Sequence, residues 1–186
     1  MKFIGNDREK QLILNMQQGD HKAMKIAYDR YAGYMTAVCS RYVLDPEDVR
    51  DILQDSFIKI FTHIGQYEFR ENASLKSWMT RIVVNESLKF LQKSSRYCFI
   101  EKVDEYPELP DAELNTTEIP FAQMQEMIRA LPVGYRTVFN LYVFERKSHQ
   151  EIATLLNIKE NSSASQFHRA KNLLAMQIKK QLNHAT

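Results

Sequence analysis

Apolar residues recur every three or four positions along most of this 186-residue chain, which is the spacing at which side chains share one face of an α-helix. The clearest stripe runs from Val49 to Ile64, after Asp45 and Pro46, a pair typical of a helix start. The same periodicity predicts further helices over residues 8–17, 20–43 and 75–93. Five glycines and five prolines are too few for a turn-rich β fold, so the sequence predicts an all-α protein.

The stretch from Ser148 to Leu174 has the pattern of two helices joined by a tight turn. Ser148 and Glu151 form a capping box, and Asn157 is the residue type that best tolerates a positive φ at a sharp turn. The second helix has a stripe of Ser163, Phe167, Ala170 and Leu174, with Gln166, Arg169 and Lys171 off that line. This helix-turn-helix pattern favours DNA binding in the major groove, although an ordinary αα-hairpin shares much of it.

Charge divides the chain into three parts. Residues 1–96 carry a net charge of +3, residues 97–127 carry −7 and residues 128–186 carry +6, within a total of +2. The acidic part contains several prolines and lacks helical periodicity, which is typical of a linker. The sequence therefore predicts two small helical domains, residues 1–96 and 123–186, joined by an acidic flexible linker over residues 97–122. Basic domains suit a polyanionic partner, but a charged face is also commonly only solvated.

Two surfaces of the first domain are candidates for a partner. The helix from residue 46 has a polar face opposite its apolar stripe, and the helix from Leu75 has a non-acidic row of Arg81, Asn85 and Lys89 at four-residue spacing. Such a row can follow phosphates while one amide reads a base. The loop between these helices carries aromatic, cationic and amide groups that suit stacking on unpaired bases. Loop aromatics can equally pack back into a core, and either helical face can simply be solvated.

Residue patterns for catalysis or metal binding are absent from the sequence. It has no Gly-rich phosphate loop, nucleophile elbow or Cys/His ligand spacing. Asp48, Asp51 and Asp55 share helical spacing, but they have no ligands from a second segment to complete a cation site. Cys39 and Cys98 are expected to be reduced thiols. We therefore expect no enzyme activity, cofactor, metal or small-molecule substrate. No apolar run is long enough to span a membrane or act as a signal peptide, so we expect a cytoplasmic protein.

Three segments in order resemble a bacterial extracytoplasmic-function (ECF, group IV) RNA polymerase sigma factor. They are DPEDVRDILQDSFIKIF from Asp45, SLKSWMTRIVVNESLKFL from Ser74, and LPVGYRTVFNLYVFERKSHQEIATLLNIKENSSASQFHRAK from Leu131. The resemblance implies that the first domain binds core RNA polymerase and the promoter −10 element, and that the second binds the −35 element. It also implies promoter melting by the helix from Leu75 and a linker threaded through the polymerase. Family members are commonly held inactive by an anti-sigma factor, which the resemblance adds as a partner.

The resemblance assigns residues to three contacts. The core polymerase contacts that it implies are Asp48, Asp51, Gln54, Asp55, Phe57 and Lys59. The −10 contacts are Tyr67, Phe69, Arg70, Asn72, Trp78, Arg81, Asn85 and Lys89, and those from Tyr67 to Asn72 belong to a loop that captures a flipped-out base. The −35 contacts are Asn161, Ser162, Ala164, Ser165, Gln166, His168, Arg169 and Lys171.

The second C-terminal helix departs from the family pattern. Relatives often carry basic residues where Ala164 and Gln166 stand, and Ser or Pro where Lys159 stands. Each lost contact lowers DNA affinity or changes the favoured base, and Gln166 is expected to pair with adenine. Two other functions stay open on the residues alone. A stand-alone helix-turn-helix repressor or activator would leave residues 1–96 as a ligand or dimer domain. A helical adaptor would bind only protein and imitate a sigma factor.

Overall fold

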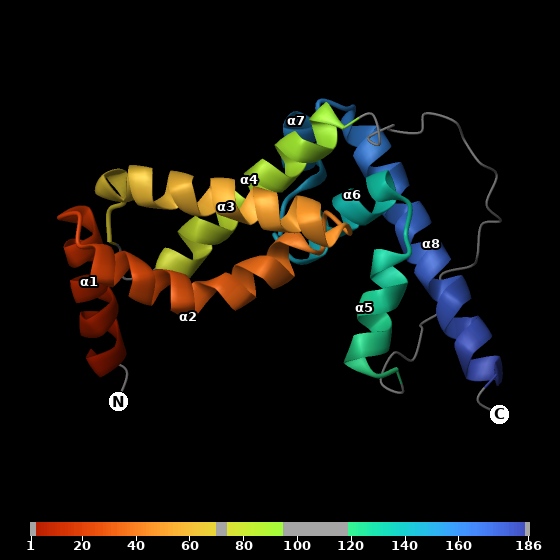
Figure 1. Cartoon of the computed structure of the whole chain (residues 1–186). Coiled ribbons are helices and arrows are strands. Elements are labelled where there is room, and N and C mark those ends of the chain that lie inside the picture. Colours follow the sequence, from red (N-terminus) through yellow and green to blue (C-terminus); the bar gives the residue numbers. More distant parts are fainter. Residues whose placement is uncertain (1–2, 70–73, 95–118, 185–186) are drawn as a thin grey trace. The chain divides into compact units, whose positions relative to one another are not determined.

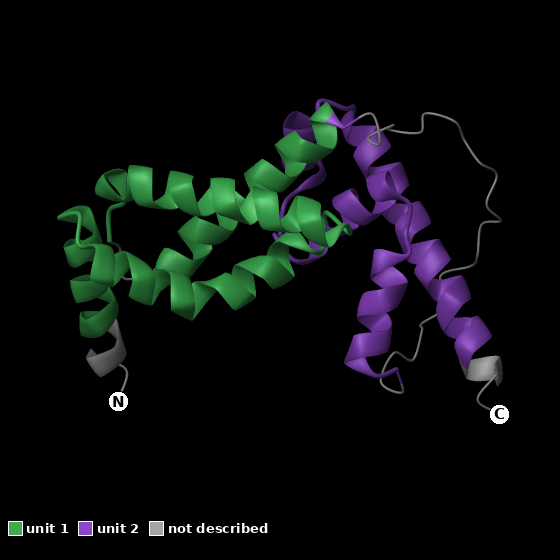
Figure 2. Ribbon diagram, viewed as in Figure 1, with its two compact units in different colours: residues 1–93 green, residues 94–186 purple. Residues whose placement is uncertain are grey.

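The computed structural model describes residues 3–69, 74–94 and 119–184 (Figure 1). Within these ranges the chain forms eight α-helices and one short 3-10 helix and contains no strand, so the all-α prediction is confirmed for them. The chain divides into two compact units, residues 1–93 and 94–186 (Figure 2). Most of the predicted acidic linker, residues 97–118 of 97–122, lies outside the described residues.

Unit 1 is built from four helices and a short connecting turn. They are α1 (Phe3–Gln17), α2 (His21–Cys39), α3 (Pro46–His63), η1 (Ile64–Gln66) and α4 (Leu75–Lys93). Helices α2, α3 and α4 pack against one another, and their shared core contains Met35, Val38, Ile60, Met79 and Val83. The expected start of α3 is confirmed, because the Asp45 side chain accepts from the Glu47 backbone N–H at 2.9 Å.

The end of α2 differs from the prediction. The helix was expected to reach residue 43, but it ends at Cys39 with Ser40 as the capping residue. Tyr42 and Val43 are still fully or almost fully buried, and the Tyr42 N–H donates to the Cys39 carbonyl oxygen at 2.9 Å. Apolar residues in a buried turn thus continue the pattern of the helix, so periodicity alone overestimates its length.

Unit 2 contains α5 (Phe121–Arg129), α6 (Val133–Val143), α7 (His149–Leu156) and α8 (Glu160–His184). The long helix α8 packs against the other three. Ile119, Leu131, Tyr135 and Leu174 belong to one core cluster of this unit. Helix α5 begins two residues inside the range expected for the linker, after Pro120. None of the helices in the described ranges combines the length and apolar character needed to cross a lipid bilayer.

Candidate nucleic-acid interface

The turn between α7 and α8 has the geometry that its residues predict. The Glu151 N–H donates to Ser148 Oγ at 3.2 Å, and the Ser148 N–H donates to Glu151 Oε2 at 2.8 Å, which completes the capping box. Asn157 takes the left-handed conformation, with φ 54° and ψ 50°. The hydrogen bond from the Ser148 backbone, followed by the contact with Lys147, lowers the pKa of Glu151. The predicted helix-turn-helix is therefore present as a backbone arrangement.

An aromatic stack that the sequence does not predict joins α6, α7 and α8. The His149 ring stacks on Tyr142, with centroids 4.8 Å apart and planes inclined by 20°, and the Tyr142 ring lies 4.3 Å from that of Phe167. His149 Nδ1 is 3.0 Å from Oγ of the buried Ser163. These contacts fix the first turns of α8 against the helix that precedes it. Tyr142 and His149 lie on different helices, so helical periodicity within either segment does not reveal their contact.

Gln166, which is among the predicted −35 contacts, is buried in this structure. Gln166 is only 5% exposed. Its side chain lies against the start of α6, where a Cβ placed on Gly134 would be 3.0 Å from Gln166 Oε1. That oxygen is buried and has no hydrogen-bond partner among the described residues. The absence of a side chain at Gly134 leaves the space that the Gln166 amide fills. In this structure the Gln166 amide is therefore not presented to solvent, and its pairing with adenine stays a prediction.

The other predicted residues of α8 are at least partly accessible. Arg169 is half-buried, and its guanidinium donates to the Tyr135 hydroxyl at 3.5 Å. The Lys171 ammonium lies 5.6 Å from the centre of the Phe167 ring. Ser162 is half-buried, whereas the exposed positions are Asn161, Ala164, Ser165, His168 and Lys171. The exposed face of α8 is thus mainly neutral over its first turns and gains cations only toward Arg169 and Lys171.

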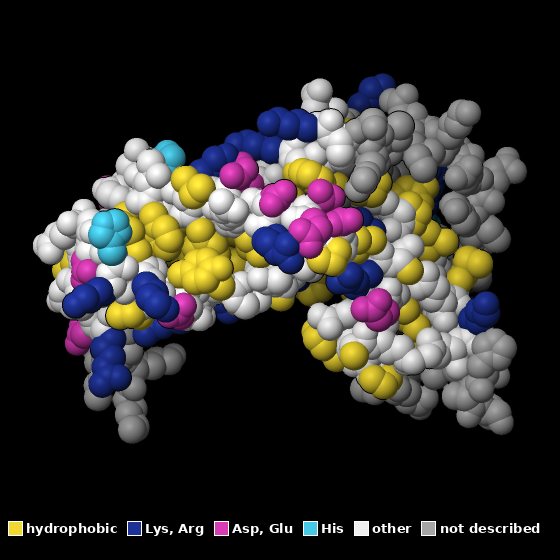
Figure 3. Space-filling model, in the orientation of Figure 1, with side chains coloured by type: hydrophobic (Ala, Val, Ile, Leu, Met, Phe, Trp, Pro, Cys, Tyr) yellow, Lys and Arg dark blue, Asp and Glu magenta, His cyan; other side chains and the backbone are white. Residues whose placement is uncertain are grey.

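Helix α4 presents the predicted row to solvent. Ser74 precedes the first residue of the helix and caps it, because its Oγ accepts a hydrogen bond from the Ser77 backbone N–H at 3.2 Å. Arg81, Asn85 and Lys89 are all exposed, on the side opposite a buried face of Met79, Val83, Ser87 and Leu91, among others. Figure 3 shows Lys and Arg side chains along the edge of unit 1 that α4 forms, and acidic side chains gathered over the neighbouring α3. The row is a continuous non-acidic surface, as the sequence predicts.

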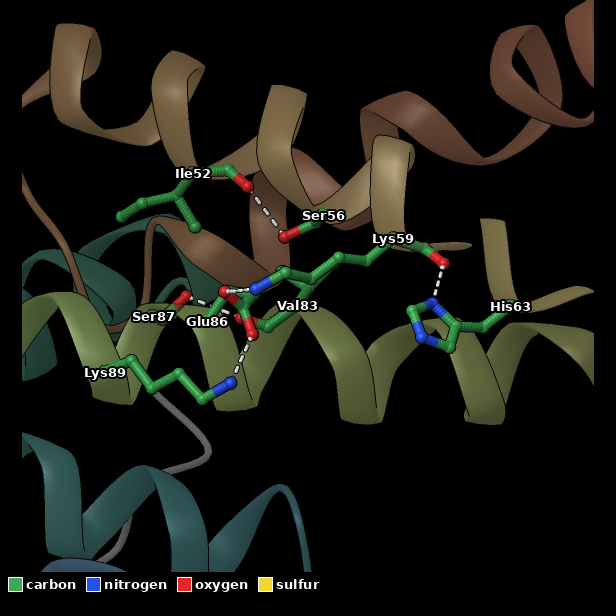
Figure 4. A network of polar contacts seen from close by, with 8 residues as sticks. All are labelled: Ile52, Ser56, Lys59, His63, Val83, Glu86, Ser87 and Lys89. Carbon is green, nitrogen blue, oxygen red and sulfur yellow. Dashed lines mark hydrogen bonds and ion pairs between the residues drawn. The ribbon is translucent and has the colours of Figure 1, made fainter. Parts of the chain in front are cut away.

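A single carboxylate joins α4 to α3. Glu86 accepts a hydrogen bond from the Lys59 ammonium on one oxygen and from the Lys89 ammonium, at 2.9 Å, on the other (Figure 4). Burial acts to raise the pKa of Glu86, but the hydrogen bonds and charges of the two lysines outweigh it and lower that pKa. Lys59 and Lys89, which the resemblance assigns to different partners, therefore share one acidic group inside this protein.

The loop aromatics divide between the core and the surface. Tyr67 is buried and its ring centre lies 5.2 Å from that of Trp78, while the Gln17 amide donates to the Tyr67 carbonyl oxygen at 2.9 Å. Burial raises the pKa of the Tyr67 phenol. Phe69 and Trp78 are half-buried, and the predicted contacts Arg70 and Asn72 lie outside the described residues. Tyr67 thus belongs to the packed interior, in line with the alternative that loop aromatics pack back into the core.

The polar face of α3 is accessible except at one predicted contact. Asp51, Gln54 and Asp55 are exposed and Asp48 is half-buried. Phe57 is only 4% exposed, and its ring centre lies 4.7 Å from that of Tyr28 on α2, so its ring packs in the core, and its contact with core polymerase stays a prediction. Beside it, a groove of about 620 Å³ is lined mainly by apolar side chains of α2 and α3, including Tyr28, Leu53, Phe57, Ile58 and Phe61.

No metal or redox centre is found within the described ranges. No three His, Cys, Asp or Glu side chains there lie close enough together to hold a metal ion. Cys39 is a buried free thiol whose pKa is raised by burial, and the Ser87 hydroxyl donates to its Sγ at 3.4 Å. Cys98 lies outside the described residues.

Two family models match this chain, one in each unit. Sigma-70 region 2 matches residues 27–97 and Sigma-70 region 4 matches residues 121–174. The ECF RNA polymerase sigma-E factor of Haemophilus influenzae is 26% identical over 179 residues, covering 90% of this chain and 93% of that protein. The ECF sigma factor SigW of Bacillus subtilis is 24% identical over 183 residues, covering 91% of this chain and 96% of its own.

A solved structure supports the same fold. The structure of CnrH, in complex with the cytosolic domain of CnrY, covers 92% of this chain and 97% of its own length with a TM-score of 0.51 and 16% sequence identity. Both family models and the full-length relatives agree on one class of protein. The chain belongs to the extracytoplasmic-function sigma factors, non-enzymatic subunits through which RNA polymerase recognises promoters.

Proposed function

We propose that the two units divide promoter recognition, unit 1 binding and opening the −10 element and unit 2 binding the −35 element. The observation that carries this proposal is the row on α4. Arg81, Asn85 and Lys89 are exposed together on the face opposite the core, where cations can follow phosphates and the Asn85 amide can read a base. The domain limits in this proposal, residues 1–96 and 123–186, remain those predicted from the sequence.

The −10 contact also involves the segment before α4. Phe69 and Trp78 keep part of their surface accessible, and a partly exposed ring can stack on an unpaired base. Tyr67 supports Trp78 from within the core rather than meeting DNA itself. Arg70 and Asn72 stay in the proposal as predicted contacts with the flipped base. Stacking on accessible rings stabilises a base that has left the duplex and so offsets the few kcal/mol that unstacking costs.

The −35 contact is expected to be modest. Before Arg169 and Lys171, the exposed side of the first turns of α8 offers side chains other than lysine and arginine, namely Asn161, Ser162, Ala164, Ser165 and His168. Few cations give few phosphate contacts, and affinity for DNA depends strongly on their number. Gln166 is left out of this surface because it is buried. Two weak contacts held at a fixed spacing by polymerase can still act together through effective concentration.

The α3 surface is the proposed contact with core polymerase. Asp48, Asp51, Gln54 and Asp55 form a largely exposed acidic and amide face, which suits a positively charged partner surface. Lys59 is engaged by Glu86, so its part in this contact is secondary. A protein with these partners would work in the cytoplasm, where bacterial polymerase and DNA are found.

We further propose a regulatory protein partner of the anti-sigma class. The groove between α2 and α3 leaves Tyr28 and Ile58 about half exposed, and neighbouring apolar side chains line it. Exposed apolar patches of this kind commonly mark protein interaction sites. The fold shared with CnrH, whose solved structure contains the cytosolic domain of CnrY, supports such a partner.

Run-off transcription with purified bacterial core polymerase tests the main proposal. The wild-type chain is expected to direct initiation at a subset of a promoter library. Arg81→Ala should reduce open-complex formation about tenfold, because each lost contact to DNA costs on the order of 1–3 kcal/mol. Arg8→Ala removes an exposed arginine from α1 and serves as the matched control, with initiation unchanged. Equal losses in both variants would contradict the role of the α4 row.

Duplex-DNA binding without polymerase and run-off transcription together separate the alternative functions. A stand-alone repressor or activator would bind duplex DNA tightly without polymerase, whereas we expect the free chain to bind duplex DNA poorly. A protein-only adaptor would compete for polymerase and give no promoter-specific transcript. Either of these outcomes would reject the proposed function.

A further inference from the structure

Glu86 is the only acidic residue in α4, and it interrupts an otherwise non-acidic helix beside the proposed DNA-facing row. It follows Asn85 directly and precedes Lys89 by three positions. Its side chain is only 13% exposed, whereas those of Lys59 and Lys89 are 42% and 59% exposed. The carboxylate thus lies behind the two ammonium groups, within reach of both and little accessible to solvent.

Both oxygens of Glu86 are occupied by cations. Lys59 Nζ reaches across from α3 to Oε2, and Lys89 Nζ turns back along α4 to Oε1 at 2.9 Å (Figure 4). The two lysines lower the pKa of Glu86 despite its burial, so the group is ionised at neutral pH. An ionised carboxylate between two ammonium groups reduces the positive potential that each can offer to another anion.

The three members of the row are therefore not equivalent. Arg81 has no carboxylate partner among the described residues, and Asn85 is neutral. Lys89 is the member whose charge is already engaged. Because Lys89 is more than half exposed, its pairing with Glu86 is weak enough for a well-placed phosphate to displace it. Lys59, which lies on another helix, would keep Glu86 ionised and in place after Lys89 leaves.

We propose that Glu86 is a positioning residue that withholds Lys89 from DNA until the promoter is properly placed. The inference rests on the proposed function, in which α4 faces promoter DNA. Non-specific binding depends almost entirely on lysine and arginine contacts with phosphates. A row with one cation withheld binds arbitrary DNA less tightly. Polymerase then supplies the geometry in which a phosphate replaces Glu86 as the partner of Lys89.

The test measures how the full-length chain binds a fluorescein-labelled single-stranded oligonucleotide of arbitrary sequence as salt is varied. Glu86→Gln keeps the shape of the side chain and removes its charge. Releasing one lysine should steepen the dependence of log K on log[salt] by about 0.7 for single strands. Between about 50 and 200 mM salt, the variant should therefore lose about 2.5-fold more affinity than wild type. Lys89→Gln in the Glu86→Gln background should remove this gain.

The matched control is Asp7→Asn, which removes one exposed negative charge from α1 and changes the net charge equally. It should leave the salt slope unchanged. A slope that rises equally in both variants would assign the effect to net charge and overturn the proposal. An unchanged slope in a folded Glu86→Gln protein would overturn it as well, leaving Glu86 a purely structural residue.

Lys89→Gln alone gives a second test that does not depend on the folding of the Glu86 variant. Because Lys89 is withheld in the free chain, this change should alter the slope far less than Arg81→Ala does. Equal reductions for the two variants would reject the inference. If Arg81→Ala also leaves DNA binding unchanged, the fault lies with the proposed function, because α4 would then not face nucleic acid at all.

Discussion

Helices α4 and α8 are both amphipathic, and the sequence predicts that both face DNA, yet only α4 exposes the amide that is expected to read a base. The Asn85 amide on α4 is exposed, whereas the Gln166 amide on α8 is buried. The buried face of α4 consists mostly of apolar side chains. The buried stripe of α8 contains Ser163 and Gln166 beside Ala170 and Leu174. Periodicity detects a buried face only where apolar residues mark it.

The different packing of the two helices explains this outcome. Helix α4 packs on α2 and α3, whereas α8 packs on α5, α6 and α7. Three neighbours cover a wider arc of α8 than its apolar residues alone indicate. Gly134 contributes no side chain where α6 meets α8, and the Gln166 side chain fills that space. A polar residue can therefore lie inside such a contact while its sequence position suggests the surface.

The largest effect is expected from matched amide-to-carboxylate substitutions in the two helices. Gln166→Glu places a charge in a buried site and should lower the free energy of unfolding of unit 2 by about 3 kcal/mol, since unpaired buried charges are costly. Asn85→Asp makes the same change on an exposed row and should alter stability by less than about 0.5 kcal/mol. Urea unfolding of the full-length chain, followed by circular dichroism, measures both.

For DNA binding the order of the two variants should be reversed, with the larger effect from Asn85→Asp. Asn85→Asp adds a negative charge next to the proposed phosphate path and should weaken binding of single-stranded DNA. If Gln166→Glu leaves stability intact but abolishes dependence on the −35 sequence, then Gln166 faces DNA in solution and the contrast between the helices fails.

The contact between Gly134 and Gln166 allows a smaller and more specific test. Gly134→Ala should be unfavourable in the wild-type background, because the new Cβ would lie 3.0 Å from Gln166 Oε1. In a Gln166→Ala background that conflict is removed, and the better helix propensity of alanine should instead stabilise α6. The double-mutant cycle should give a coupling free energy of about 1 kcal/mol. Additive effects would show that the two residues do not pack together.

Local signals in the sequence predicted much of this molecule. The Asp45 cap, the Ser148–Glu151 capping box and the left-handed Asn157 follow from hydrogen-bonding and backbone preferences of single residues. The contacts that escaped prediction join different elements. Phe57 is buried because Tyr28 lies against it, and His149 stacks on Tyr142 and lies near Phe167. Which residues meet across helices depends on their packing angles, and one-dimensional periodicity does not contain that information.

Glu86 illustrates the same limit within the proposed site. The sequence shows that Glu86 precedes Lys89 by three positions in one helix, but it could not show that Lys59 and Lys89 both reach the Glu86 carboxylate. Lys59 is 27 residues away in the chain and lies on another helix. The exposed row itself was predictable because Arg81, Asn85 and Lys89 repeat every four positions along one helix.

The smallest predicted effect is the loss of stability in acid, which differs between Glu86 in unit 1 and Glu151 in unit 2. The folded-state pKa of Glu86 is lowered, so its ion pairs stabilise unit 1 above the ordinary glutamate pKa of about 4.3. That contribution is lost as pH falls through the lowered folded-state value. Glu151 in unit 2 has the same sign, but it is fully exposed, so added salt should weaken its contribution more.

Trp78, the single tryptophan of the chain, reports on unit 1. In urea unfolding followed by its fluorescence, Glu86→Gln should reduce the free energy of unfolding by about 1 kcal/mol at neutral pH, the upper range for partly exposed ion pairs. The difference from wild type should shrink toward zero as pH falls below the lowered folded-state pKa of Glu86, where the carboxylate is protonated in both states. Lys59→Gln should show the same pH dependence, because it removes the other partner. A difference that persists unchanged in acid would mean that Glu86 stabilises α4 by packing rather than by charge.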